Sequence, residues 1–124
     1  MPRLRSIGGL VLLVVPALCL IAASASAASA QSADATVTMR RMSFAPTEVH
    51  ITPGQTVLWN NTDFIGHTVT ADDNSFDSGD MEPGDTFSQT FTDPGTYQYY
   101  CVPHGSPGLV GMAATIVVDD PNAT

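Results

Sequence analysis

The chain of 124 residues has four basic and twelve acidic side chains and no lysine, so its formal net charge is −8 at pH 7. This balance argues against nucleic acid and anionic membranes as partners, because both require cationic protein surface. The length is sufficient for one domain with one hydrophobic core and too short for two.

The first 30 residues have the pattern of a secretory signal peptide. Arg3 and Arg5 precede an apolar run over residues 7–23, and an alanine–serine tract follows that ends in Ala28-Ser29-Ala30. A charged start, an apolar middle and a small-residue exit are the parts of such a signal. We therefore expect a signal peptide over residues 1–30, one domain over residues 31–124, and an exported location, periplasmic or otherwise extracytoplasmic. The alternative is a retained membrane anchor, against which the run is short and interrupted by Gly and Pro.

Removal of residues 1–30 would leave 94 residues (124 − 30) and a net charge of −10, from two arginines and twelve acidic residues. Cys101 would then be the one remaining cysteine, because Cys19 lies in the apolar run. A lone cysteine in an exported protein has no internal partner, which favours a metal ligand over a free thiol. The negative charge favours either a redox protein partner with a basic docking surface or solubility alone.

From residue 35 onward, short segments alternate apolar and polar residues and are separated by turns rich in Pro and Gly. Period-two alternation predicts half-buried strands over residues 35–41, 48–51, 56–60, 67–70, 86–91, 96–101 and 113–118. Phe44-Ala45-Pro46 is expected to interrupt this series, and Trp59, the one tryptophan, is expected to anchor the core. No helical periodicity of useful length follows residue 30. The pattern predicts an all-β sandwich with Greek-key connections.

One short segment carries three potential metal donors: the thiolate of Cys101, the imidazole of His104 and the thioether of Met112. Two histidines, one cysteine and a weak, distant methionine form the donor set of a blue-copper electron-transfer site. His67, at the start of a predicted strand, is the natural second histidine, whereas His50 has the solvent-facing phase of its strand. The sequence therefore predicts one copper ion held by these four residues.

Several segments together resemble the small cupredoxins of the plastocyanin, pseudoazurin and amicyanin type. They are Phe44-Ala45-Pro46, residues 53–57 with Trp59, His67-Thr68-Val69, residues 76–79, residues 94–97 and residues 100–104. The resemblance implies an eight-stranded cupredoxin-like sandwich that binds one type 1 copper. It implies copper ligands at His67, Cys101 and His104, a weak axial methionine, and one-electron transfer.

The last loop departs from the family pattern and leaves two registers open. The family's methionine usually follows the second histidine by roughly three to five residues, whereas Met112 follows His104 by eight. In one register, Leu109-Val110-Gly111 takes the methionine's place and the axial donor is lost. In the other, Gly111-Met112 is kept and the loop is longer, which loops tolerate. We expect the second register, with a plain core role for Met112 as its alternative.

The function that these features predict is a monomeric electron carrier rather than an enzyme. His104 is expected to expose one ring edge within an apolar patch. Tyr100 is expected either to offer a second route for the electron or to pack in the sheet. The rival with the same donors is a periplasmic copper carrier or scavenger. An enzyme would need a second copper, for which the three histidines do not suffice. A zinc site fits the thioether less well than copper does. A Cys–His nucleophile is weaker still, because the sequence shows no orienting carboxylate or oxyanion loop.

Overall fold

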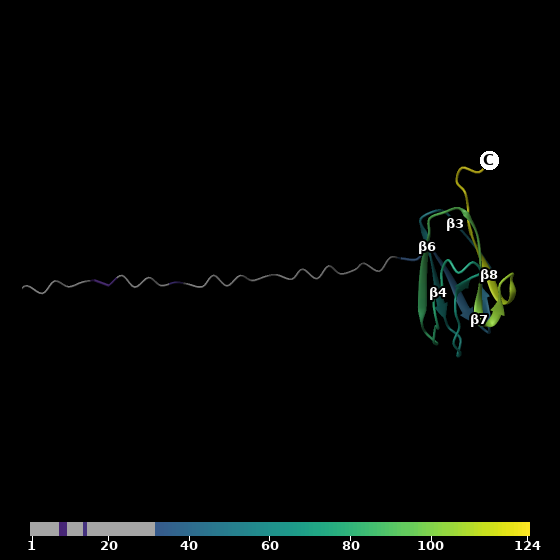
Figure 1. Ribbon diagram of the computed structural model, residues 1–124, viewed down its shortest axis with the longest axis horizontal. Helices are drawn as coiled ribbons and strands as arrows, with labels where there is room; N and C mark the ends of the chain where they lie inside the picture. The colour runs from purple at the N-terminus through teal and green to yellow at the C-terminus, as the bar shows by residue number, and fades with distance from the viewer. Residues whose placement is uncertain (1–7, 10–13, 15–31) are drawn as a thin grey trace, which may run out of the picture.

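The computed structural model describes residues 8–9, 14 and 32–124 (Figure 1). Over these residues the chain forms eight strands and no helix, which confirms the all-β prediction. They are β1 (Ala35–Arg40), β2 (Ser43–Ala45), β3 (Glu48–Ile51), β4 (Gln55–Asn61), β5 (Thr70–Ala71), β6 (Thr86–Phe91), β7 (Gly95–Ser106) and β8 (Val110–Val118). A helix long and apolar enough to span a membrane is not found in the described part of the chain. The predicted signal peptide lies almost entirely outside it.

The strands form two four-stranded sheets, with the orders β2-β1-β4-β6 and β3-β8-β7-β5. Figure 1 shows β4 and β6 at one side of the domain and β7 and β8 at the other. The chain passes repeatedly from one sheet to the other. For this reason β1 pairs with β4, and β3 with β8, in parallel, whereas the other pairs are antiparallel. The predicted eight-stranded sandwich is confirmed.

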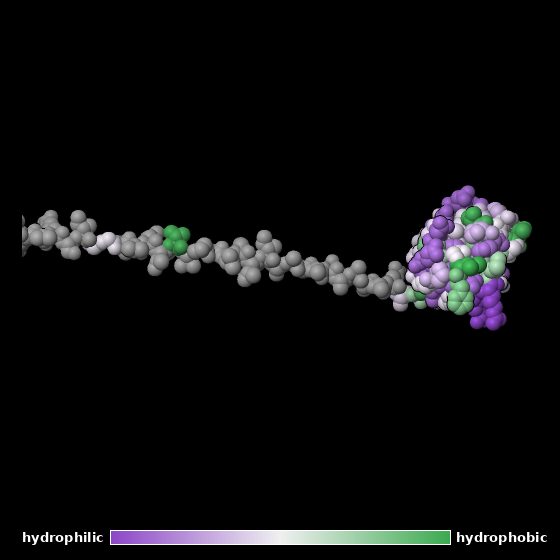
Figure 2. Space-filling model, turned by 90° about the horizontal axis from the view of Figure 1, so that it is seen from below, coloured by the Kyte–Doolittle hydropathy of each residue, from purple (hydrophilic) through white to green (hydrophobic). Residues whose placement is uncertain are grey.

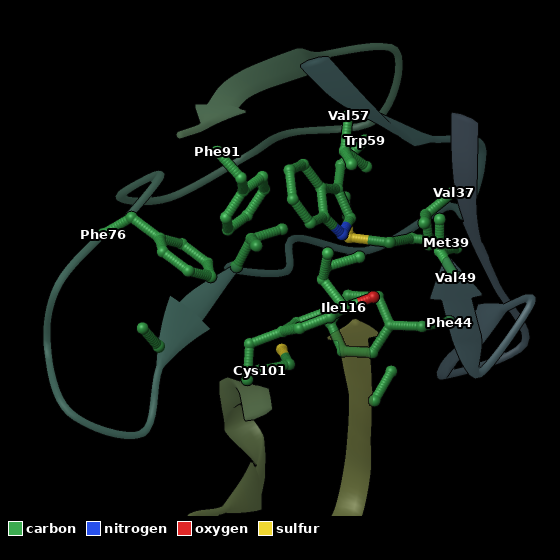
Figure 3. Close-up of a cluster of buried hydrophobic side chains, with 14 of the residues drawn as sticks. Val37, Met39, Phe44, Val49, Val57, Trp59, Phe76, Phe91, Cys101 and Ile116 are labelled. Carbon is green, nitrogen blue, oxygen red and sulfur yellow. The ribbon is translucent and has the colours of Figure 1, made fainter. Parts of the chain in front are cut away.

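The core lies between the sheets and is formed by the inward phase of each strand. Trp59 of β4 is fully buried, as predicted, and its ring is surrounded by other aromatic rings (Figure 3). Its ring centroid lies 5.4 Å from that of Tyr99 and 5.7 Å from that of Phe87. Aromatic pairs in such arrangements stabilise a core by about 0.5–1.5 kcal/mol each beyond their buried area. Cys101 belongs to the same buried cluster, so the core extends directly to the predicted metal ligand.

Strand β2 differs from the sequence prediction, which placed an interruption at Phe44-Ala45-Pro46. Ser43–Ala45 instead pairs with β1 in an antiparallel hairpin. The connecting residues Arg41 and Met42 have φ angles of 52° and 55°, as in a two-residue turn in which both central residues have positive φ. The alternation pattern missed this hairpin because the turn lacks the Gly or Asn that normally marks it.

The strand predicted over residues 67–70 is also shorter than expected. Only Thr70–Ala71 forms a strand, β5, while His67 makes an isolated bridge with Met81. The predicted segment therefore overlaps β5 only at Thr70, and alternation could not identify the partner of His67. The neighbouring acidic segment, residues 72–80, returns beside β5 through a second isolated bridge, Thr70 to Asp77.

Candidate metal centre

A large irregularity in the β7–β8 hairpin positions Cys101 and His104. The two strands pair regularly up to Tyr100 opposite Ala113, and pairing resumes with Gly105 opposite Gly111. Four residues of β7, 101–104, therefore lie opposite the single residue Met112 of β8. A bulge of this kind re-aims side chains at the end of a sheet. Val102 and Pro103 thus lie in a bulge within a longer hairpin, and this bulge turns His104 back toward Cys101.

Two glycines close this hairpin directly after the bulge. A Cβ atom on Gly105 would lie 2.6 Å from the Met112 carbonyl oxygen, and one on Gly111 would lie 2.5 Å from the His104 carbonyl oxygen. Contacts this short do not occur for real Cβ atoms, so the close approach of the two backbones requires glycine at both positions. Gly111 also has a φ of 68°, in the left-handed region. The glycines therefore hold the backbone of His104 against that of Met112.

His67 lies in the connection between β4 and β5 and is fixed by hydrogen bonds of its backbone. Its N–H donates to the Met81 carbonyl at 3.0 Å, and its carbonyl accepts from the Met81 N–H at 2.8 Å. The buried amide of Asn61 donates to the carbonyls of Met81 and Ile65, both at 2.9 Å. These bonds hold the loop that carries His67, and the histidine is only 1% exposed.

The three predicted ligands meet at one point. The Nδ1 atoms of His67 and His104 are 3.1 Å apart, and the Cys101 sulfur lies 3.6 Å and 3.4 Å from them respectively. Within the described part of the chain, this is the group of metal-binding side chains whose ligand atoms all lie within 4.8 Å of one another. Three donors spread at 120° around one ion at about 2.0–2.3 Å are about 3.5–3.8 Å apart. The two sulfur–nitrogen distances are close to this range, and the two nitrogens need to separate by a few tenths of an ångström. The site therefore has the size that one small metal ion requires.

The Cys101 thiol is buried away from solvent. Burial raises its pKa, and this is the largest effect on the group. The nearby backbones of Thr68 and His104 act in the opposite direction. The Thr68 N–H lies 3.4 Å from the sulfur. A buried thiol becomes a thiolate most readily when a cation binds it, so this cysteine is suited to ligate a metal rather than to react with solutes.

The second ring nitrogen of His67 has a partner that the sequence did not identify. Its Nε2 lies 3.0 Å from Oδ2 of Asp63, the same oxygen that accepts from the Met42 N–H at 2.9 Å. The Met42 bond, which has the larger effect, and the His67 bond hold the pKa of Asp63 below its ordinary value. A carboxylate at Nε2 fixes the ring and leaves Nδ1 free for a metal. The signal in the sequence was an acidic residue four positions before the histidine.

The two candidate axial residues occupy very different positions. Met112 is 3% exposed on the inward face of β8, as predicted, together with Ala114, Ile116 and Val118. Leu109 is 50% exposed at the tip of the hairpin and has a φ of 62°. The register that keeps Gly before Met therefore brings Met112, not Leu109, opposite the bulge.

The surroundings of His104 are apolar and exposed. His104 itself is partly buried. The β7–β8 hairpin that carries it also has a set of exposed apolar residues, the apolar patch: Val102, Pro103, Pro107, Leu109 and Val110. Figure 2 shows exposed hydrophobic residues, in green, among mainly hydrophilic ones on one face of the domain. Tyr100 is half-buried on the opposite side of β7, next to Thr70. His50 lies apart from the metal centre, on the surface between Glu48 and Asp119.

Comparisons with known proteins agree with this geometry. The family model described as copper binding proteins of the plastocyanin/azurin family matches residues 31–119. Chloroplastic plastocyanin from Oryza sativa subsp. indica is 37% identical over an alignment of 79 residues, which covers 55% of this chain and 51% of the relative. Chloroplastic plastocyanin from Physcomitrium patens is 33% identical over 109 residues, covering 75% and 65%. The chain thus spans about half the length of the first of these relatives.

Solved structures show the same fold. A purple cupredoxin from Nitrosopumilus maritimus superimposes with a TM-score of 0.61 at 26% identity, covering 69% of this chain and 100% of that chain. A reduced Cu(I) form of an amicyanin variant superimposes with a TM-score of 0.62 at 32% identity, covering 73% and 85%. The donor set, its spacing and these similarities show that the chain belongs to the plastocyanin/azurin family of copper-binding proteins.

Proposed function

We propose that this protein is a one-electron carrier whose single type 1 copper is held by His67, Cys101 and His104, with Met112 as a weak axial donor. The observation that carries the proposal is the convergence of two Nδ1 atoms and one thiol sulfur within 4.8 Å of one another. Thiolate and thioether donors favour copper over zinc. Bound copper supplies the one-electron step between Cu(II) and Cu(I).

The chain's own contribution is to keep the donors in place. His67 is fixed at its backbone by Met81 and at its ring by Asp63. Cys101 and His104 are fixed by the bulge and by the glycine contact that follows it. Because all three donors are held before metal binds, little rearrangement accompanies a change in copper charge. That property suits rapid electron exchange.

Electrons enter and leave by way of His104, which is the most exposed of the three ligands. The apolar patch around it provides a surface for brief contact with a redox protein. Twelve acidic residues and four basic ones favour a partner whose docking surface is basic around its rim, because opposite charges accelerate encounter. The carrier acts as an exported monomer without catalytic activity of its own, and neither nucleic acid nor membrane is its partner.

The first test is the visible and electron-paramagnetic-resonance spectrum of the Cu(II)-loaded protein. We expect an intense thiolate-to-copper band that is lost or strongly altered in His104→Ala and unchanged in His50→Ala, a histidine outside the site. Stopped-flow reduction should be slowed only in the first variant. A protein that stays colourless with Cu(II), or a His104→Ala variant with an unaltered spectrum and rate, would refute the proposal. Rapid loss of copper to a chelator, with slow electron exchange, would indicate a copper carrier instead.

The axial role of Met112 is tested separately. Met112→Leu should keep the strong band but raise the reduction potential, because the oxidised ion loses more than the reduced ion when a donor is removed. Leu109→Met is the matched control and should change neither quantity, since residue 109 lies at the exposed hairpin tip. If Met112→Leu leaves the potential and spectrum unchanged, Met112 is a core residue only.

A further inference from the structure

A chain of hydrogen bonds leads from the residue after Cys101 to the acidic segment on the surface. The Val102 N–H donates to Oγ1 of Thr68 at 2.9 Å. The hydroxyls of Thr68 and Thr70 are 3.0 Å apart, and the Thr70 hydroxyl lies 3.1 Å from Oδ1 of Asp77. Both threonines are buried, with exposures of 5% and 4%, so water does not substitute for these partners.

The number of available protons fixes the direction of donation along this series of hydrogen bonds. An ionised carboxylate has no proton to donate, so the Thr70 hydroxyl proton goes to Asp77. The Thr70 oxygen can then only accept, and the proton between the two hydroxyls must come from Thr68. The Thr68 oxygen accepts from the Val102 N–H. Every bond therefore points from the ligand-bearing strand toward the carboxylate.

Asp77 is held in place by the backbone bonds of its neighbours and by a bond to its own carboxylate. Ala71 N–H donates to the Phe76 carbonyl and Ser78 N–H to the Val69 carbonyl, both at 2.9 Å. The Gly79 N–H adds a further bond at 2.9 Å to Oδ1 of Asp77. The Asp77 carboxylate, at the end of the hydrogen-bond chain, is thus a fixed acceptor.

The Cys101 sulfur is a competing acceptor close to the Thr68 hydroxyl, because the Thr68 N–H lies 3.4 Å from the sulfur and the Thr68 Oγ1 is bonded to the N–H of the residue after Cys101. One hydroxyl carries one proton. While that proton is donated to Thr70, it cannot be donated to the sulfur. Hydrogen bonding around the cysteine sulfur is one of the factors that set the reduction potential of a type 1 copper site, so the orientation of this hydroxyl has a functional consequence.

We infer that Thr70 and Asp77 are positioning residues for the copper centre, which orient the Thr68 hydroxyl away from the Cys101 sulfur and anchor the backbone of Val102. The inference rests on the proposed copper ligation by Cys101. A proton turned toward the sulfur would withdraw electron density from it, favour Cu(I) and raise the potential. The hydrogen-bond chain therefore keeps the thiolate a strong donor and the potential low.

The experiment compares two substitutions at one position. Thr70→Val preserves the shape of the side chain but removes the acceptor, whereas Thr70→Ser keeps the hydroxyl. In Thr70→Val the potential should rise and the thiolate-to-copper band should move to shorter wavelength. In Thr70→Ser both should match the wild type. Adding Thr68→Val to Thr70→Val should reverse these shifts, because the proton that turns to the sulfur is then absent.

Asp77→Ala tests the far end of the hydrogen-bond chain and replaces Thr70→Val if that variant does not fold. It should raise the potential by more than Asp80→Ala does, since Asp80 carries the same charge in the same exposed segment. Equal potentials and spectra in Thr70→Val and Thr70→Ser would overturn the inference. If Thr70→Val does not fold, equal shifts in potential in Asp77→Ala and Asp80→Ala would overturn the inference.

The hydrogen bonds themselves can be tested without copper. In the metal-free wild-type protein, the Thr68 hydroxyl proton should exchange slowly with water and show an NMR contact to the Thr70 side chain. The Val102 amide should exchange roughly tenfold faster in Thr68→Val, a change of the size expected for the loss of one hydrogen bond. Absence of both signals would refute the hydrogen-bond chain. Failure of the wild type to develop colour with Cu(II) would refute the copper assignment instead.

Discussion

The glycines of the β7–β8 hairpin allow a sharp test of how the metal loop is held, because three of them differ in the kind of constraint they meet. Gly108 has a φ of 86° but open space around its Cβ position. Gly105 lies outside the left-handed region, but its added Cβ would lie 2.6 Å from a backbone oxygen. Gly111 combines a φ of 68° with a contact of 2.5 Å. Alanine therefore probes backbone strain at Gly108, a steric clash at Gly105, and both together at Gly111.

The expected losses of stability follow from these contacts. Gly108→Ala should cost about 1 kcal/mol, the usual cost of placing an L-residue in the left-handed region. Gly105→Ala should cost about 2 kcal/mol, a typical value for overpacking where the neighbours cannot move aside. Gly111→Ala should cost about 3–4 kcal/mol, because it adds the strain to the clash. For a domain of this size, 1 kcal/mol corresponds to roughly 4–8 °C in Tm.

Chemical denaturation of the metal-free protein, followed by the fluorescence of the buried Trp59, measures these differences. Copper affinity measured by competition with a chelator should follow the same order, because the Gly105 and Gly111 contacts involve the backbones of Met112 and His104. Gly108→Ala should retain copper affinity, since no backbone atom is displaced. If Gly111→Ala is no less stable than Gly108→Ala, the close contact does not hold the hairpin and the reasoning is wrong.

Two further predictions concern side chains near and far from the metal. Asp63→Ala should weaken copper binding about 10- to 100-fold, because His67 loses the carboxylate that orients its ring. Competition titration checks this, and an affinity within twofold of wild type would contradict it. Hydrogen bonds with Glu48 and then Asp119 raise the pKa of His50. The stability that protonated His50 adds should be complete below its unfolded pKa of about 6.5 and lost as pH rises through the raised folded pKa. His50→Ala should therefore lose stability relative to wild type at about pH 5 but not at about pH 9. Equal denaturation midpoints for both proteins at the lower pH would exclude this contribution.

Local features of the sequence were enough to predict the fold class and to name candidate metal donors. Alternation identified the inward residues of the long strands, because side-chain direction in a strand repeats every two residues. The combination of Cys101, His104 and Met112 with an upstream histidine indicated copper, because donor chemistry depends on residue type and not on the backbone that carries it. The assignment of His50 to the surface followed from the same periodicity and agrees with its exposed position.

Only the tertiary structure decided how these donors are held. The Asp63 carboxylate bonds to His67 because the loop before the histidine folds back toward the β1–β2 turn. The bulge at residues 101–104 and the contact between Thr70 and Asp77 likewise depend on which strands pair and in what register. Periodicity specifies which face of a strand is buried, but it does not specify the partner, because pairing is set by packing between segments far apart in the chain. For this reason the candidate ligands could be named from the sequence, whereas the hydrogen bonds that orient them could not.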